Sequence, residues 1–98
     1  MIMKMIFLSY SAGIDEEIAD ALADLGIKCY TKWQDVLGIG NTSGPHLGTH
    51  VWPKTNSFLG IAIEEEKVDG LLHKVRELKA TFGKEGVKAF VLPLEEAV

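Results

Sequence analysis

Cysteine is almost absent from this sequence, which contains one, Cys29, among its 98 residues. A single cysteine cannot close a disulfide within the chain, and a four-cysteine zinc site is excluded as well. The chain also lacks any run of the roughly 20 apolar residues that a membrane-crossing helix requires. These absences favour a protein of the reducing cytoplasm.

Positive charge is scarce too. Ten lysines and arginines stand against 14 aspartates and glutamates, so the formal net charge is -4 at pH 7. The lysines are scattered along the chain rather than clustered. Because the sequence offers no basic surface field, nucleic acid is a poor candidate for the partner.

Catalytic motifs are missing as well. The sequence contains neither a Gly-x-Ser-x-Gly nucleophile elbow nor a His-Glu-x-x-His metal motif, two patterns with a known catalytic geometry. Cys29 falls on the apolar side of a predicted strand, where we expect it to belong to the core. The sequence therefore predicts no catalytic residues and no enzyme.

Apolar residues are plentiful enough for one folded domain over residues 1–98. They make up 47% of the chain, against 24% charged residues, a balance typical of globular proteins rather than disordered ones. The apolar pattern changes between a period of two and a helical period along the chain. It predicts strand, helix, strand, strand, helix and strand at residues 4–10, 15–25, 27–34, 58–63, 64–83 and 87–92.

This order of elements predicts an α+β fold of the ferredoxin-like βαββαβ type. Right-handed crossovers place both helices on one face of an antiparallel sheet, and a long loop, residues 38–56, joins the second and third strands. The first, third and fourth strands are apolar on both faces, although two helices cover only one. We therefore expect a homo-oligomer that buries the other face.

Two segments have the composition of an anion site. Gly38, Gly40 and Thr42 lie in a glycine-rich stretch that leaves room for close approach of the backbone to a phosphate. A second stretch combines glycine amides with lysine charge, and its residues are Gly83, Lys84, Gly86 and Lys88. The alternatives are a flexible turn for the first stretch and a helix cap with solvated lysines for the second.

His46 and His50 form the candidate metal site. Histidines four residues apart share one side of a helix and suit a divalent metal such as copper or zinc. Pro45 and Gly48 argue against a regular helix in this segment. The alternative is that these histidines pack against Trp52 or bond to the backbone.

Three segments, in order and at matching spacing, resemble the PII signalling family and its PII-like relatives. Residues 21–27, Ala-Leu-Ala-Asp-Leu-Gly-Ile, are similar to the end of the family's first helix and the start of its second strand. Val36-x-Gly38-x-Gly40 with Gly44 is similar to the glycine pattern at the base of the long T-loop. Residues 88–98 resemble the last strand and the turn after it.

The resemblance implies a ferredoxin-like homotrimer that binds an adenine nucleotide, ATP or ADP, at clefts between subunits. In PII proteins the T-loop base of one subunit and the B-loop of its neighbour enclose the nucleotide, and 2-oxoglutarate joins it through magnesium. Carried over, Gly38, Gly40 and Thr42 become T-loop contacts. The phosphate cradle of the B-loop becomes Gly83, Lys84, Gly86 and Lys88.

Three departures mark the chain as a divergent member. Thr42 stands where the family has a glutamine that contacts nucleotide and 2-oxoglutarate. PII proteins continue beyond the position of Val98 into an arginine-bearing segment that clamps the phosphates, so the resemblance implies weak nucleotide binding or none. The loop, residues 38–56, contains no tyrosine and hence no acceptor for tyrosine uridylylation.

Two functions follow as hypotheses. The first is a cytoplasmic sensor that binds a small anionic effector and signals through the long loop to a protein such as a membrane transporter or an enzyme. The second is a metal-binding or metal-tolerance trimer, similar in architecture to the CutA proteins, with His46 and His50 as ligands. A purely structural assembly without a ligand is a third possibility.

Overall fold

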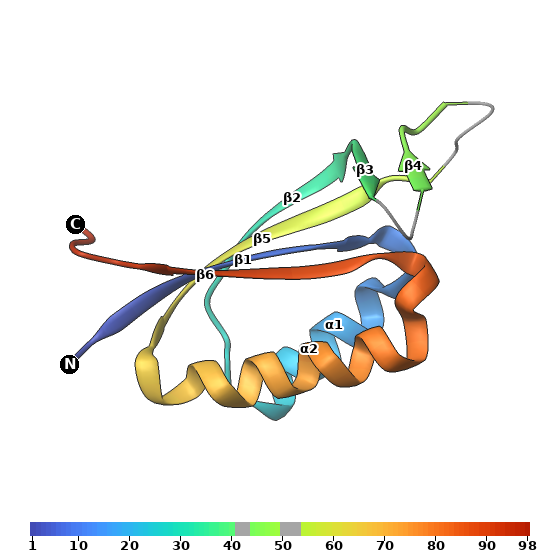
Figure 1. The fold of residues 1–98 in the computed structure, drawn as a ribbon. Coiled ribbons are helices and arrows are strands. Elements are labelled where there is room, and N and C mark those ends of the chain that lie inside the picture. Colours follow the sequence, from blue (N-terminus) through green and yellow to red (C-terminus); the bar gives the residue numbers. More distant parts are fainter. Residues whose placement is uncertain (41–43, 50–53) are drawn as a thin grey trace.

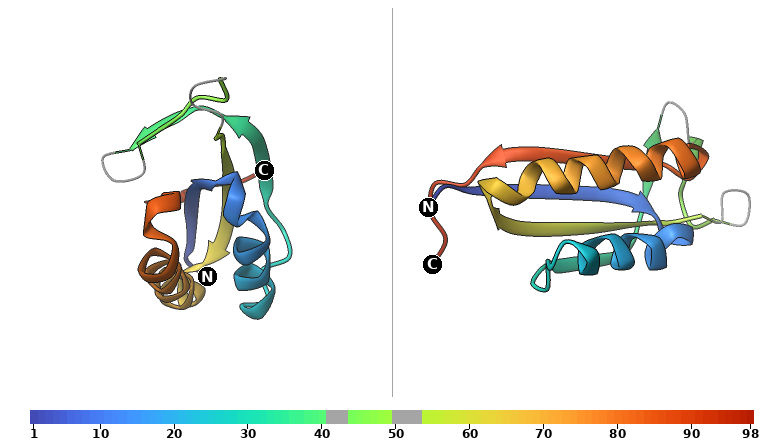
Figure 2. Two further views of the ribbon diagram at one scale, coloured as in Figure 1. Left: turned by 90° about the vertical axis from the view of Figure 1, so that its right-hand side faces the viewer. Right: turned by 90° about the horizontal axis from the view of Figure 1, so that it is seen from below.

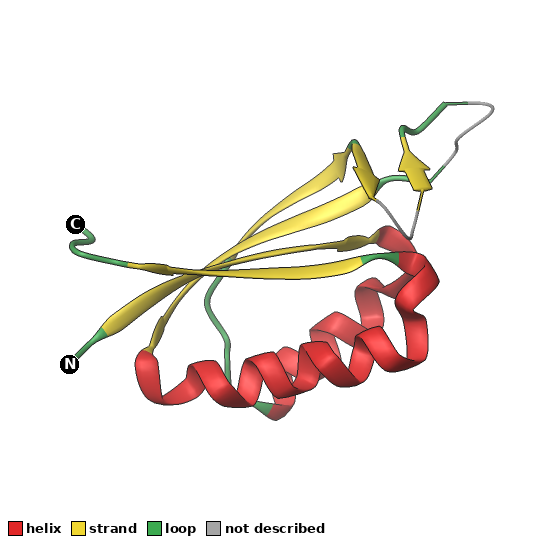
Figure 3. Cartoon of the chain, viewed as in Figure 1, coloured by secondary structure: helices red, strands yellow, loops and turns green. Residues whose placement is uncertain are grey.

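Four long strands and two helices form two layers in the computed structural model, which describes residues 1–40, 44–49 and 54–98 (Figures 1 and 3). The strands make one sheet in the order β2-β5-β1-β6. Their bounds are Met3–Ser11 for β1, Thr31–Val36 for β2, Asn56–Glu64 for β5 and Val87–Pro93 for β6. The helices are α1, Asp15–Asp24, and α2, Val68–Phe82.

Both helices cover the same face of an antiparallel sheet, as the views in Figure 2 show. Strand β1 lies in the middle, where Ile6 pairs with Ile61 of β5 on one side and with Val91 of β6 on the other. The chain therefore has the predicted ferredoxin-like βαββαβ fold. Neither helix among the described residues is long and apolar enough to cross a membrane.

The core lies between the sheet and the helices. Along β1 every second side chain points into this layer, so that Ile6, Leu8 and Tyr10 are at most 2% exposed. The matching residues of the helices recur at helical spacing, among them Ile18 and Leu71. Full burial of one such aliphatic side chain contributes about 1.5 to 3 kcal/mol, so this layer supplies the main stabilisation of the fold.

Among the described residues, the other face of the sheet carries large apolar side chains and no helix. We call it the uncovered face, and its aromatic residues are Phe7, Trp33, Phe58 and Phe90. The Phe58 ring lies 5.4 Å from that of Phe7 and 5.8 Å from that of Trp33. Trp33 is 48% exposed and Phe90 46%. The expected apolar face is thus present, and burial of this face in a homo-oligomer stays a prediction.

The second strand begins later than predicted. Helix α1 ends in a turn in which the Ile27 N–H donates to the Leu22 carbonyl at 2.9 Å, and Ile27 is buried in the core. Residues 28–30 then cross from the helix layer to the sheet edge, where β2 begins (Figure 1). The prediction that Cys29 belongs to the core is wrong, because Cys29 lies on this crossing and is exposed.

The segment expected to be a long loop contains regular structure. Strands β3, Gly38–Gly40, and β4, Gly44–His46, pair as an antiparallel hairpin, which we call the loop hairpin. Strand β5 then begins at Asn56. Strands of three residues rich in glycine show no alternation of apolar side chains, so the hydrophobic pattern could not reveal them. The predicted site residues Thr42 and His50 lie outside the described residues.

Candidate functional site: a cleft beside the loop hairpin

A broad open cleft lies between the loop hairpin and the turn that joins α2 to β6. Six of the seven residues predicted to bind a nucleotide or anion line it, and the seventh, Thr42, lies outside the described residues. These six are Gly38, Gly40, Gly83, Lys84, Gly86 and Lys88. The two glycine-rich segments, expected to face each other across a subunit boundary, thus meet in one cleft of a single chain.

The turn on one side of the cleft owes its shape to Gly86. After α2 a short 3-10 helix, Gly83–Glu85, ends at Gly86, which has a φ of 80° that disfavours residues with a side chain. The Gly86 N–H donates to the Gly83 carbonyl at 3.3 Å, and the Gly86 carbonyl accepts from the Ser11 N–H at 3.1 Å. The turn is therefore held against the end of β1, and β6 carries Lys88 along the cleft.

The charges in the cleft favour an anion. Lys79, Lys84 and Lys88 all line it. The acidic residue beside them, Glu85, is already engaged: it accepts a hydrogen bond from the Ser11 hydroxyl at 3.0 Å and pairs with the Lys54 ammonium at 3.6 Å. Lysine charge and glycine backbone together suit the oxygens of a phosphate or another oxyanion.

On the opposite side of the cleft, a bulge turns the chain from β2 into the loop hairpin. The pairing of β2 with β5 shifts between Trp33 and Val36, and Asp35 adopts a left-handed φ of 55° within this irregularity. The Thr55 hydroxyl donates to an Asp35 carboxylate oxygen at 3.4 Å. The bulge thus ends the regular pairing of β2 and re-aims the chain toward Gly38.

Asn56 is a cleft residue that the sequence did not reveal. It is the first residue of β5 and lines the cleft. Its side-chain oxygen lies 2.7 Å from Nδ1 of His46. A lone asparagine at the start of a strand belongs to no recognisable motif, and its partner is ten residues away in the sequence. Only the fold brings the two side chains together.

His46 is not an exposed loop histidine. It lies on β4, is 2% exposed and has one hydrogen-bond partner among the described side chains, Asn56. Within residues 1–40, 44–49 and 54–98, no three histidine, cysteine, aspartate or glutamate side chains gather as a metal site would require. Because His50 lies outside the described residues, a metal shared by the two histidines stays a prediction.

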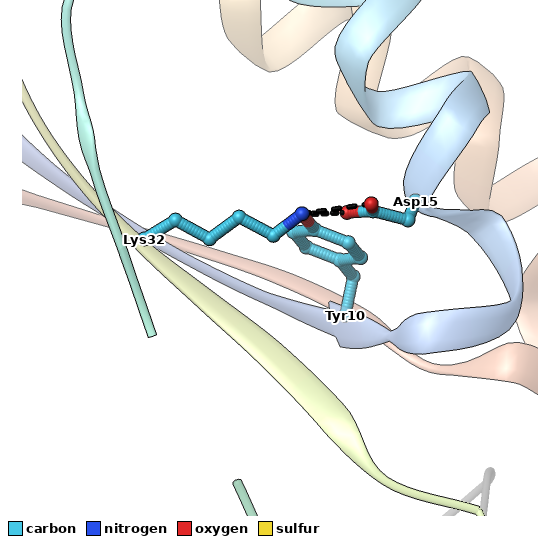
Figure 4. Close-up of polar contacts among 3 residues, drawn as sticks. All are labelled: Tyr10, Asp15 and Lys32. Carbon is cyan, nitrogen blue, oxygen red and sulfur yellow. Dashed lines mark hydrogen bonds and ion pairs between the residues drawn. The ribbon is translucent and has the colours of Figure 1, made fainter. Parts of the chain in front are cut away.

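A second polar cluster lies on the helix side of the sheet (Figure 4). Asp15, at the start of α1, accepts a hydrogen bond from the Tyr10 hydroxyl at 2.6 Å and binds the Lys32 ammonium at 2.6 and 2.7 Å. The bonds from Lys32 and then Tyr10 lower the pKa of Asp15. Burial, followed by the bond to Asp15, raises the pKa of Tyr10 well above its usual range. The cluster joins α1, β1 and β2.

The fold and the cleft together define a class of protein. A ferredoxin-like domain with a hairpin between β2 and β5, next to a lysine-lined cleft, is suited to binding a small anion. The family model for nitrogen regulatory protein P-II matches residues 3–98 of the chain. The chain belongs to this family, as the three sequence segments predicted.

Solved structures share the fold at low sequence identity. CPII from Thiomonas intermedia K12, bound to ADP and bicarbonate, has a TM-score of 0.76 and 22% identity over 96% of this chain and 87% of its own. A protein from Thermus thermophilus, described as a PII-like signalling protein, has a TM-score of 0.66 and 21% identity, over 96% and 91% of the two chains. A search of curated proteins gave no match.

Proposed function

We propose that this protein is a cytoplasmic PII-like sensor that binds a small anion in the cleft and signals through the loop hairpin to a protein partner. One observation carries the proposal: the loop hairpin and the lysine-bearing turn before β6 border the same cleft. A ligand that contacts both sides would bias the conformation of the hairpin, which is how a binding event becomes a signal. The protein is not an enzyme in this proposal.

The proposed ligand is an adenine nucleotide, ADP or ATP, with a small oxyanion such as bicarbonate as a further effector. CPII, which shares the fold, was solved with ADP and bicarbonate bound. In the present chain the phosphates would lie against Gly83, Lys84, Gly86 and Lys88, and the glycines at the base of the hairpin would approach from the other side. Backbone amides and lysine ammonium groups are the donors that this chemistry requires.

A homotrimer is part of the proposal. Trp33, Phe58 and Phe90 line the cleft and also belong to the uncovered face. A neighbouring subunit packed on that face would therefore border the cleft and complete its wall. The target of the signal would be a membrane transporter or an enzyme, as the family resemblance implies.

Isothermal titration calorimetry with ADP and with ATP tests the proposal. Wild-type protein should bind nucleotide saturably, and Lys88→Ala should weaken binding at least tenfold, or about 1.4 kcal/mol, because it removes a charge from the cleft. Lys28→Ala is the matched control: Lys28 is exposed on the crossing between α1 and β2 and does not line the cleft. Absence of any heat at millimolar nucleotide and bicarbonate would overturn the proposed function.

A further inference from the structure

The hydrogen bond between His46 and Asn56 has a defined direction. The atoms that meet at 2.7 Å are Nδ1 of His46 and the side-chain oxygen of Asn56. An amide oxygen carries no proton, so the imidazole must donate from Nδ1, which in a neutral ring is the tautomer with Nε2 unprotonated. This bond also orients the Asn56 amide, because it points the oxygen at His46 and turns the NH2 group away from it.

The NH2 group of Asn56 lies over the backbone of Gly38. A methyl group added at Gly38 would be 2.5 Å from the amide nitrogen, closer than a side-chain carbon can come. Asn56 and Gly38 both line the cleft. Within the part of the chain that the structure describes, this NH2 group has no hydrogen-bond acceptor, and its two donor hydrogens suit a ligand oxygen at the base of the loop hairpin.

His46 is held in place at a cost. Its side chain is 2% exposed, and Nε2 is buried without a hydrogen-bond partner among the described residues. Burying a polar atom without a partner is unfavourable, because the atom loses its hydrogen bonds to water. The one polar side-chain contact that His46 makes within the described ranges is the bond that orients Asn56, which favours a functional reason for burying a histidine here.

The same contact connects the cleft to the loop hairpin. His46 pairs directly with Gly38 across the hairpin, while Asn56 pairs with Val36 of β2 and with Ser11 of β1. The bond from His46 to Asn56 thus ties the last residue of β4 to the main sheet. A ligand that binds the Asn56 amide and shifts it would therefore alter the hydrogen bond that holds the loop hairpin to the main sheet.

We propose that Asn56 is a ligand-contacting residue whose NH2 group donates to an oxyanion oxygen of the effector, and that His46 is the positioning residue that couples this contact to the loop hairpin. The inference rests on the proposed function, since it assigns a contact within the same cleft. The oxygen belongs either to a nucleotide phosphate or to a small free oxyanion such as bicarbonate. Separate titrations with ADP and bicarbonate distinguish these sources.

Asn56→Asp is the decisive variant. The carboxylate still accepts the bond from His46, but it presents a negatively charged oxygen to the cleft where the NH2 group was. We expect at least a tenfold loss of affinity for the ligand whose oxygen Asn56 contacts, with the fold intact by circular dichroism. Gln34→Glu, at an exposed residue of β2, is the matched control for the same change of amide to acid; it should leave the affinity within twofold.

The role of His46 has its own readouts. Nitrogen-15 NMR of the imidazole should show the ring protonated at Nδ1, and its signals should move when the ligand binds wild-type protein but not when it is added to Asn56→Asp. Hydrogen exchange of the backbone amides of residues 38–40, 44 and 46 should slow on ligand binding in wild-type protein. That response should be lost in His46→Ala, where the Asn56 amide is free to rotate.

The outcomes separate the two proposals. If wild-type protein binds ADP or bicarbonate and Asn56→Asp binds both as tightly as wild type does, the inference is wrong while the proposed function stands. If wild-type protein binds neither ligand, the proposed function itself fails. A ring protonated at Nε2 would overturn the positioning role of His46, even if His46→Ala does not fold well enough to be tested.

Discussion

At the scale of single residues, Asp15 shows how one carboxylate can join three elements. It binds Lys32 of β2 and Tyr10 of β1 from the first position of α1, where a negative charge also interacts favourably with the helix dipole. Tyr10 is buried, whereas Asp15 keeps 42% of its side chain exposed. The screening that this exposure brings limits what the ion pair contributes to stability.

Asp15→Asn should destabilise the fold by about 1 kcal/mol at pH 7, because it removes a charge-assisted pair that is partly screened by solvent. The folded state lowers the pKa of Asp15, so this stabilisation is present above its ordinary pKa of 3.8 and is lost as the pH falls through the lowered value. Urea unfolding of both proteins between pH 7 and pH 2 measures the difference, which should shrink only in the acid range.

Asp20→Asn provides the comparison for this experiment. Asp20 lies on the same helix and is exposed, so its replacement should change stability by less than about 0.5 kcal/mol at any pH. Equal effects of the two substitutions would contradict a specific role for the cluster of Asp15, Tyr10 and Lys32.

Single residues also show what sequence reasoning could reach in the cleft. Glycine and lysine at fixed spacing have a chemical meaning that does not depend on the rest of the fold, so Gly38, Gly40 and Lys88 could be found from their pattern. The role of Asn56 depends on a buried histidine on another strand, and the environment of His46 depends on the pairing of β3 with β4. Neither relation has a signature in the linear sequence.

At the scale of elements, long amphipathic segments were predictable and short ones were not. Helices α1 and α2 have ten and 15 residues with apolar side chains at helical spacing, and β1 and β5 have nine residues each. The loop hairpin has two strands of three residues. It is stabilised by contacts such as that of His46 with Asn56, which a pattern of apolar residues does not encode.

Gly38→Ala tests how closely the loop hairpin packs on the main sheet. The added methyl group would meet the Asn56 amide nitrogen at 2.5 Å, so the amide must move or the hairpin must shift. We expect a destabilisation of about 1 to 3 kcal/mol, the usual cost of overpacking. In an Asn56→Ala background the same substitution should cost clearly less, and urea unfolding of the four proteins gives the coupling between the two positions.

The coupling decides between two causes. Gly38→Ala could lower the free energy of unfolding equally with and without the Asn56 amide. The backbone of β3, not the contact with Asn56, would then be what requires glycine. A coupling energy of at least about 0.5 kcal/mol between the two substitutions would mean that the close contact of Gly38 with the Asn56 amide is what requires glycine.

At the scale of the whole molecule, the two helices cover one face of the sheet and leave the other face, within the described part of the chain, without a covering layer. The sequence predicted this arrangement, because β1, β5 and β6 carry apolar side chains in both directions, and the structure shows large aromatic side chains left at the uncovered face. A stable interface between subunits buries about 1,600 Å² in total. The uncovered face is where this chain offers apolar area of that kind, and it continues into the cleft.

Phe90→Glu should therefore convert the expected oligomer into monomers, because a subunit interface cannot bury an unpaired carboxylate without a cost of several kcal/mol. Light scattering during gel filtration gives the mass directly. Ala23→Glu, at an exposed residue of α1 on the helix side of the sheet, introduces the same charge away from the uncovered face and the cleft and should leave the mass unchanged. If wild-type protein is already a monomer at micromolar concentration, the face has another occupant, and the cleft must bind its ligand without a neighbouring subunit.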